Sequence, residues 1–218
     1  MIQFFHVYKY YLKGSEVLED LNLQIEKGEF VFVTGPSGAG KTTLLKLMFS
    51  AELPTRGQVI INGHNVTRLK RNSIPYLRRN IGVVFQDFKL LYDRTVFDNV
   101  ALALSVLDVK KKEIRKRVLE ILKMLGLHQK INAYPIRLSG GEQQRIAIAR
   151  ALVSEPVILL ADEPTGNLDP DLTIETIRLF EEVNAKGTTV VVATHDKNLI
   201  SKYRKRVITL EHGRIADK

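Results

Sequence analysis

The sequence lacks cysteine, long apolar runs and an export signal, and each absence excludes a class of protein. Without cysteine, the chain of 218 residues can form no disulfide framework, no thiolate zinc site and no catalytic thiol. No apolar run approaches the roughly 18 residues that a membrane-spanning helix needs. Residues 1–14 alternate like a strand and lack the apolar segment of a secretory signal. We therefore expect a soluble, cytoplasmic protein.

The composition is that of a basic globular protein. Apolar residues make up 44% of the chain, which excludes a disordered chain, and the length fits one large domain or a core with an inserted subdomain. The net charge of +9 favours contact with phosphates, nucleic acid or an anionic membrane surface. The densest cationic run is KKKEIRKR at residues 110–117. Apolar residues at helical spacing accompany it, so we interpret it as the solvated face of a helix, with a membrane or nucleic-acid contact as the alternative.

The order of apolar runs predicts an α/β fold with a mostly parallel sheet, an antiparallel β portion and a helical subdomain. Residues 17–25 and 58–63 read as the antiparallel portion, and residues 206–216 as a C-terminal hairpin. Continuous apolar runs separated by helices indicate a parallel sheet covered on both faces; they lie at residues 30–34, 81–85, 157–161 and 188–194. A helical pattern fills residues 96–151, and we expect a helical insertion at about residues 87–136.

A glycine-rich loop joins the strand at residues 30–34 to the following helix. It reads GPSGAGKT, which has the form G-x-x-x-x-G-K-[ST] in the strand-to-helix context that a P-loop requires. Glycines let backbone N–H groups turn toward a polyphosphate, and the helix N-terminus adds its positive end. Lys41 is expected to reach the β- and γ-phosphates, and Thr42 to ligate Mg²⁺. The phosphate-binding candidates are Gly35, Pro36, Ser37, Gly38, Ala39, Gly40, Lys41, Thr42 and Thr43. The alternative is a turn that merely joins strand to helix.

Two adjacent carboxylates follow the apolar run VILLA. Asp162 stands where the strand ends and is a candidate Mg²⁺ ligand, directly or through water. Glu163 points differently and is the candidate general base that polarises the attacking water. The alternative is an acidic cap after a strand, which the upstream P-loop disfavours.

The stretch LSGGEQQR predicts a helix start and a second phosphate site. Ser139 and Glu142 have the spacing of a capping box, which alone would indicate an ordinary helix N-terminus. Gly140 and Gly141, directly after the cap, expose backbone N–H groups. One chain thus carries two helix ends suited to polyphosphate, and a nucleotide clamped between two copies would use one end from each.

Together these motifs resemble the nucleotide-binding subunits of the ABC (ATP-binding cassette) family over nearly the whole chain, so the resemblance implies a single ABC ATPase domain at residues 1–218. It implies that Gln86 contacts Mg²⁺ and the lytic water, that Asp169 belongs to the D-loop and that His195 contacts the γ-phosphate. It also implies that Tyr11 stacks on adenine, with Tyr10 as the rival. The alternatives are a surface or capping role for Gln86, an ordinary strand-end histidine at 195 and ordinary packing for Tyr11.

Within this family, the stretches at residues 77–104, 134–145, 159–169 and 193–200 most resemble ATPases of a bacterial cell-division complex. ATPases of lipoprotein-release and macrolide-export systems are the alternative. The resemblance implies a homodimer formed on ATP binding, located at the cytoplasmic face of the inner membrane. It also implies an integral membrane partner that docks near residues 86–95 and, through it, control of peptidoglycan hydrolases.

Other kinds of nucleotide-binding protein fit less well. ABC ATPases that act on nucleic acid carry long coiled coils or zinc modules between the P-loop and the signature, and this chain has neither sustained heptads nor cysteines there. We therefore expect no nucleic-acid partner. A GTPase would carry an N-K-x-D motif, which is absent, and the presence of Glu163 and His195 argues against a regulator that binds nucleotide without hydrolysing it.

Overall fold

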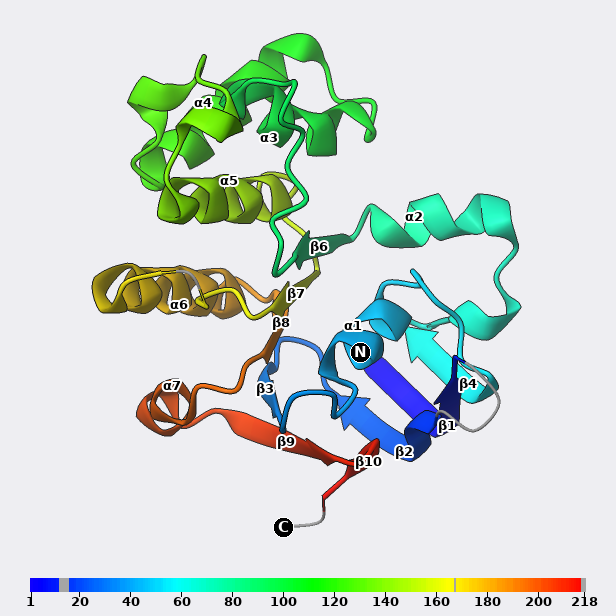
Figure 1. Cartoon of the computed structure of the whole chain (residues 1–218). Coiled ribbons are helices and arrows are strands. Elements are labelled where there is room, and N and C mark those ends of the chain that lie inside the picture. Colours follow the sequence, from blue (N-terminus) through cyan, green and yellow to red (C-terminus); the bar gives the residue numbers. More distant parts are fainter. Residues whose placement is uncertain (12–15, 167, 217–218) are drawn as a thin grey trace. The chain divides into compact units, whose positions relative to one another are not determined.

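The computed structural model describes residues 1–11, 16–166 and 168–216 (Figure 1). The chain divides into two compact units, one of residues 1–78 with 181–218 and the other of residues 79–180. The helical insertion expected at residues 87–136 lies within the second unit. Among the described residues, no helix is both long and apolar enough to cross a membrane.

The first unit contains an antiparallel sheet in the order β2-β1-β4-β5. Its strands are β1 (Ile2–Tyr10), β2 (Glu16–Ile25), β4 (Arg56–Ile61) and β5 (His64–Asn65). In β2 the apolar residues Leu21, Leu23 and Ile25 are buried while Asn22 and Gln24 between them are exposed. The alternation predicted from the sequence is therefore observed, and it places one face of this sheet against the core.

A parallel sheet in the same unit carries the glycine-rich loop. Strand β3 (Phe30–Thr34) pairs in parallel with both β8 (Thr189–Ala193) and β9 (Arg206–Glu211), and β10 (Arg214–Ile215) pairs antiparallel with β9. Burial along β3 and β8 is nearly continuous, as expected for a parallel sheet covered on both faces. The C-terminal hairpin is confirmed.

Short helices complete the first unit. They are α1 (Lys41–Met48), α2 (Ile74–Arg78), α7 (Lys197–Tyr203) and the 3-10 turns at Val66–Arg68 and Arg71–Ser73. Helix α6 (Pro170–Ala185) begins in the second unit and ends in the first.

The second unit combines one strand pair with a group of helices. Strand β6 (Ile81–Val84) pairs in parallel with β7 (Ile158–Asp162). The helices are α3 (Val96–Ser105), α4 (Lys111–Met124) and α5 (Gly140–Leu152), with 3-10 turns at His128–Lys130 and Pro135–Arg137. Helix α3 packs against α4 and α5, and α5 also packs against β6 (Figure 1). Helix α5 thus joins the helical part of the unit to the strands.

The packing of α5 on β6 leaves no room for a side chain at Gly82, which yields a stability prediction. A Cβ there would lie 2.3 Å from the backbone oxygen of Ala151 and 3.0 Å from Cγ of Pro156. Because the obstacle is backbone, Gly82→Ala should push the helix from the strand and lower the free energy of unfolding by about 1–3 kcal/mol. Urea unfolding followed by circular dichroism measures the loss.

Gly166→Ala is the matched control, because its new Cβ would meet only the oxygen of Glu163, at an ordinary 3.7 Å. Equal unfolding midpoints for the two variants would contradict the proposed close approach.

Candidate functional site

The glycine-rich loop between β3 and α1 has a backbone that other residues could not readily adopt. Gly35, Gly38 and Gly40 have φ values of 149°, 79° and 100°, in the region that favours glycine. A Cβ at Gly35 would lie 2.2 Å from the backbone oxygen of Leu210, and one at Gly40 would lie 2.8 Å from the oxygen of Val17. Gly35 and Gly40 are therefore required both by conformation and by close packing, whereas Gly38 is required by conformation alone.

The start of α1 is suited to an anion. No side chain caps the helix at Gly40, and its first turn contains no acidic residue, so no carboxylate of the helix offsets the positive end. The Lys41 ammonium donates to the backbone oxygens of Gly35 at 2.7 Å and Pro36 at 3.1 Å, which holds it over the loop. Thr42 is exposed beside it, whereas Thr43 is buried.

Tyr11 is tied to the same helix. Its hydroxyl donates to Glu52 Oε1 at 2.8 Å and lies 3.3 Å from Oγ1 of Thr43, while the Lys9 ammonium lies 5.1 Å from the ring centroid. Burial favours the neutral form of Glu52, but interactions with the Tyr11 hydroxyl and with the Lys9 and Lys46 ammonium groups lower its pKa. Glu52 therefore accepts as a carboxylate and orients Tyr11 beside the loop.

Tyr10, the rival candidate, has a different environment. Its ring stacks with Tyr8 at a centroid distance of 6.3 Å, and a hydrogen bond to Glu16 raises its pKa. The geometry thus favours Tyr11, which contacts the helix that opens with Lys41.

His195 reaches the loop region because β3 and β8 are parallel. Their paired ends are Val33 and Ala193, and the N–H of Thr194 donates to the oxygen of Val33 at 3.0 Å. His195 therefore leaves β8 at the edge of the sheet where the glycine-rich loop leaves β3. Asp196 follows it and caps α7 by accepting from the N–H groups of Asn198 and Leu199.

In the second unit, parallel pairing likewise places candidate site residues at one edge of a strand pair. Val84 of β6 pairs with Ala161 of β7, so Gln86 and the two carboxylates follow strands that end at one edge. Asp162 is only 8% exposed, whereas Gln86 is exposed. Glu163 has a φ of 45°, in the left-handed region that a non-glycine residue rarely adopts. This backbone turn directs Glu163 away from the line of the strand.

The candidate metal ligands fit Mg²⁺ by chemistry. Thr42, Gln86 and Asp162 offer hydroxyl, amide and carboxylate oxygens, the ligand class that Mg²⁺ prefers, and Mg²⁺ usually takes few protein ligands beside phosphate oxygens. Among the described residues, no group of three or more His, Asp or Glu side chains could hold a metal ion by itself. The donor set thus suits a Mg²⁺ ion that arrives with a polyphosphate.

Helix α5 begins with the predicted capping box. Ser139 Oγ accepts from the N–H of Glu142 at 3.3 Å, and the Glu142 carboxylate accepts from the N–H of Ser139 at 2.9 Å. That backbone hydrogen bond is the main reason that the pKa of Glu142 is lowered. A Cβ at Gly140 would meet no atom within 4 Å, so packing inside this chain does not require glycine there.

Asp169 has a structural contact of its own. Its Oδ1 accepts from the N–H of Leu172 at 2.9 Å, which caps the first turn of α6. The side chain is exposed, so this cap leaves it accessible from outside the chain.

Residues 86–95, which we call the docking loop, have a defined backbone. Asn99 is fully buried; its amide donates to the oxygens of Leu91 at 2.9 Å and Thr95 at 2.9 Å, and its Oδ1 accepts from the N–H of Leu91 at 2.8 Å. Leu90 is 6% exposed, whereas Leu91 and Tyr92 are 39% and 49% exposed. Leu90 thus packs inside the unit, whereas Leu91 and Tyr92 are exposed.

Arg150 and Tyr92 connect the docking loop to α5, and sequence analysis did not identify either connection. The Arg150 guanidinium donates to the oxygens of Phe88 and Lys89, both at 2.6 Å, and these two residues have φ values of 59° and 48°. The Tyr92 hydroxyl donates to Gln143 Oε1 at 3.1 Å. Burial lowers the pKa of Arg150. In the sequence, the feature that could have indicated a structural role for Arg150 is its position between Ala149 and Ala151, which are both buried.

Comparisons with known proteins agree with this geometry. Residues 18–166 match the model of the ABC transporter family. The chain is 51% identical over 213 residues to the cell division ATP-binding protein FtsE of Bacillus subtilis strain 168, covering 98% of this chain and 93% of that protein. It is 52% identical over 215 residues to FtsE of Escherichia coli strain K12, covering 99% and 97%.

A solved structure supports the fold. The ATP-binding cassette MJ0796, in a dimeric post-hydrolysis state bound to ADP and Pi, superposes with a TM-score of 0.92 at 39% identity, covering 100% of this chain and 97% of that chain. The expected α/β class, with P-loop core, antiparallel portion and helical subdomain, is therefore confirmed. A family match over residues 18–166 and identities near one half over almost the full length establish that the chain belongs to the ABC transporter family.

Proposed function

We propose that this chain is the ATP-binding and ATP-hydrolysing subunit of a membrane-bound cell-division complex. The observation that carries the proposal is the complete set of nucleotide-site residues in a chain about half identical to proteins named cell division ATP-binding protein FtsE. Catalysis converts ATP and water to ADP and phosphate. The chain acts as a homodimer at the cytoplasmic face of the bacterial inner membrane.

The first unit supplies the groups that bind the nucleotide. Tyr11, oriented by Glu52, stacks on the adenine, and the loop at residues 35–40 surrounds the phosphates with backbone N–H groups. The Lys41 ammonium exchanges its bonds to the Gly35 and Pro36 oxygens for bonds to the β- and γ-phosphates. Mg²⁺, held through Thr42, Gln86 and Asp162, neutralises phosphate charge when bound. His195 contacts the γ-phosphate.

Glu163 supplies the general base. It accepts a proton from the water that attacks the γ-phosphate, and Gln86 helps to position that water. Its unusual backbone, with a φ of 45°, separates its direction from that of the metal ligand Asp162. One carboxylate can then hold the metal while its neighbour remains available to the water.

The active species is a head-to-tail dimer. Ser139, Gly140, Gly141 and Glu142 of one copy, with Asp169, approach the nucleotide held by the loop of the other copy. The empty space at Gly140 supports this arrangement, because no residue that the structure describes lies close enough to require glycine there. The dimeric state of MJ0796 is a precedent among solved relatives.

The membrane partner is an FtsX-like integral membrane protein that docks on the docking loop. Leu91 and Tyr92 present apolar surface, and Asn99 and Arg150 hold the backbone that carries it. A short cytoplasmic helix of the partner would cover these side chains in the helix-in-groove mode. Because Arg150 and Gln143 join this loop to α5, dimer closure at the start of α5 moves the partner and controls peptidoglycan hydrolysis outside the cell.

Glu163→Gln tests the hydrolytic function. The variant should bind ATP but hydrolyse it about 10²–10⁴-fold more slowly, because a glutamine cannot accept the proton from water. Phosphate release measures turnover, and nucleotide titration measures binding. Lys41→Ala is the companion variant, which should lose ATP binding itself; wild-type turnover in Glu163→Gln would remove Glu163 from this role.

Ser139→Arg tests the shared site. A bulky cation at the dimer interface should weaken ATP-dependent dimerisation on the order of a hundredfold, because an unpaired buried charge costs about 3 kcal/mol. Sedimentation velocity with ATP, in the Glu163→Gln background, measures dimerisation, while nucleotide binding by the monomer should persist. Ser139→Ala removes the same helix cap without added bulk, so this variant should dimerise better than Ser139→Arg. If the two variants dimerise equally, the loss would come from the missing helix cap and not from a shared site.

Leu91→Glu tests the docking loop. The side chain is 39% exposed, so the isolated subunit should fold and bind ATP, while a charge on the apolar surface should abolish recruitment to membranes that contain the partner. Leu102→Glu is the matched control in the same unit, at 43% exposure on α3. Co-sedimentation with those membranes decides the matter, and retention of Leu91→Glu at the wild-type level would place the docking surface elsewhere.

A further inference from the structure

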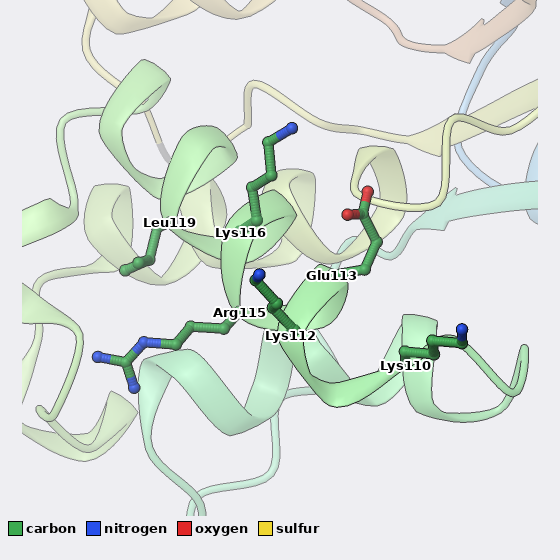
Figure 2. Close-up of a pocket in the computed structure, with 6 residues that line it drawn as sticks. All are labelled: Lys110, Lys112, Glu113, Arg115, Lys116 and Leu119. Atoms are coloured by element: carbon green, nitrogen blue, oxygen red, sulfur yellow. The ribbon is translucent and has the colours of Figure 1, made fainter.

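The exposed side of α4 carries the strongest local concentration of positive charge noted in the sequence. Lys110, Lys112, Arg115 and Lys116 line an open hollow together with Glu113 and Leu119 (Figure 2). We call the four cations the basic stripe. Figure 2 shows that their charged ends diverge, with Lys110 and Arg115 extending in opposite directions. The stripe therefore offers several separate cationic contacts and does not converge on one anion.

The basic stripe has four cations, and the residues that line the same hollow include one acid, Glu113. Glu113 accepts from Arg117, a cation outside the stripe, at 2.7 Å, and the charge of Lys116 adds to the lowering of the Glu113 pKa. Asp108 lies 3.9 Å from Arg79. Among the residues that the structure describes, none of the four stripe cations makes an ion pair. Their charge is thus available to an external anionic partner.

The sequence of α4 is also unfavourable for an isolated helix. Lysines at residues 110–112 stand at the positive end of the helix dipole, where carboxylates would be stabilising, and the first turn has one acidic residue, Glu113. Lys110 is the N-cap residue, but its side chain makes no capping hydrogen bond. Lys112 and Lys116 are four residues apart, a spacing at which like charges repel, and so are Lys111 and Arg115. A purely structural role for α4 does not explain why these like charges are placed so close together. An external anion would relieve the repulsion between them.

Packing fixes which side of α4 faces outward. Val118, Ile121 and Leu122 are buried, and the helix packs against α3 and α5. Lys112, Arg115 and Lys116 are exposed on the other side. Leu119, half-buried among them, adds an apolar group to the surface.

We propose that the basic stripe binds the anionic phospholipid headgroups of the membrane surface. Diverging cations match an extended layer of phosphates better than one free phosphate, and an apolar leucine among them suits the boundary between headgroups and acyl chains. The stripe has no aromatic side chain on which the bases of single-stranded nucleic acid could stack. The choice of a lipid surface rests on the proposed membrane location of the subunit.

This contact would add to partner docking. The docking loop leads directly into α3, and α3 packs on α4, so both surfaces belong to the same unit. A lipid contact of moderate strength would raise the effective concentration of the docking loop near its membrane partner. It would also orient the unit when the partner is absent.

Vesicle co-sedimentation of the purified full chain tests the proposal without the membrane partner. Vesicles of phosphatidylglycerol mixed with phosphatidylcholine should bind the wild type, and vesicles of phosphatidylcholine alone should not. Each cation near an anionic surface contributes about fivefold to binding, so Lys110→Gln, Lys112→Gln, Arg115→Gln and Lys116→Gln together should weaken it about 600-fold. Added salt should weaken wild-type binding, since the attraction is screened.

The matched control removes three exposed lysines and one exposed arginine from the first unit, as Lys27→Gln, Lys70→Gln, Arg71→Gln and Lys186→Gln. Loss of vesicle binding by the stripe variant alone supports the proposal. Equal loss of vesicle binding in both variants would show an effect of net charge and would overturn the proposal. Unchanged vesicle binding by the stripe variant would overturn it as well. Stripe-dependent binding to DNA or RNA without vesicle binding would assign the surface to nucleic acid.

A measurement of ATP hydrolysis distinguishes a failure of this inference from a failure of the proposed function. The stripe lies outside the nucleotide-binding and catalytic residues, so the stripe variant should hydrolyse ATP at the wild-type rate while it loses vesicle binding. An inactive wild type that still binds anionic vesicles would refute the ATPase function and leave the lipid contact intact.

Discussion

The parallel pairing of strands is the constraint on which the nucleotide site depends. Parallel neighbours end at the same edge of a sheet, so residues far apart in the chain meet where their strands stop. In the first unit this brings His195, after β8, to the edge where the glycine-rich loop leaves β3. In the second unit it brings Gln86, after β6, to the edge where Asp162 and Glu163 follow β7. The strands are almost entirely buried, which leaves the chemistry to the residues just beyond them.

Helix α5 links two functions within the second unit. Its first turn, after the cap Ser139, carries Gln143 and the two glycines proposed to face a second copy of the chain. Gln143 and, near the other end of the helix, Arg150 contact the docking loop. In the proposed mechanism, a displacement of this helix on dimer closure would therefore move the docking loop. Close packing at Gly82 attaches the same helix to the strand that precedes Gln86. Chemistry and docking thus share one structural element.

Several residues of this protein depart from what stability alone would favour. Glu163, Phe88 and Lys89 have positive φ values without being glycine, and the lysines at residues 110–112, where α4 begins, stand at the unfavourable end of the helix dipole. These residues lie after β7, in the docking loop and at the start of the basic stripe, while other non-glycine residues with positive φ, such as Asn62 and His212, lie in turns between strands. Buried contacts compensate some of them, since Arg150 binds the oxygens of both strained loop residues. Functional sites are where such compensation is expected.

Local patterns in the sequence determined the fold class, the glycine-rich loop, the carboxylate pair after β7 and the capping box of α5. Each depends on residues within a few positions of one another, through backbone conformation, hydrophobic periodicity or helix capping. Only the tertiary structure decided that Leu90 is buried while Leu91 is exposed, that Glu52 orients Tyr11, and that Arg150 holds the docking loop. These features arise from contacts between residues 41 to 62 positions apart. Sequence periodicity carries no record of such contacts, because they form only when separate elements pack together.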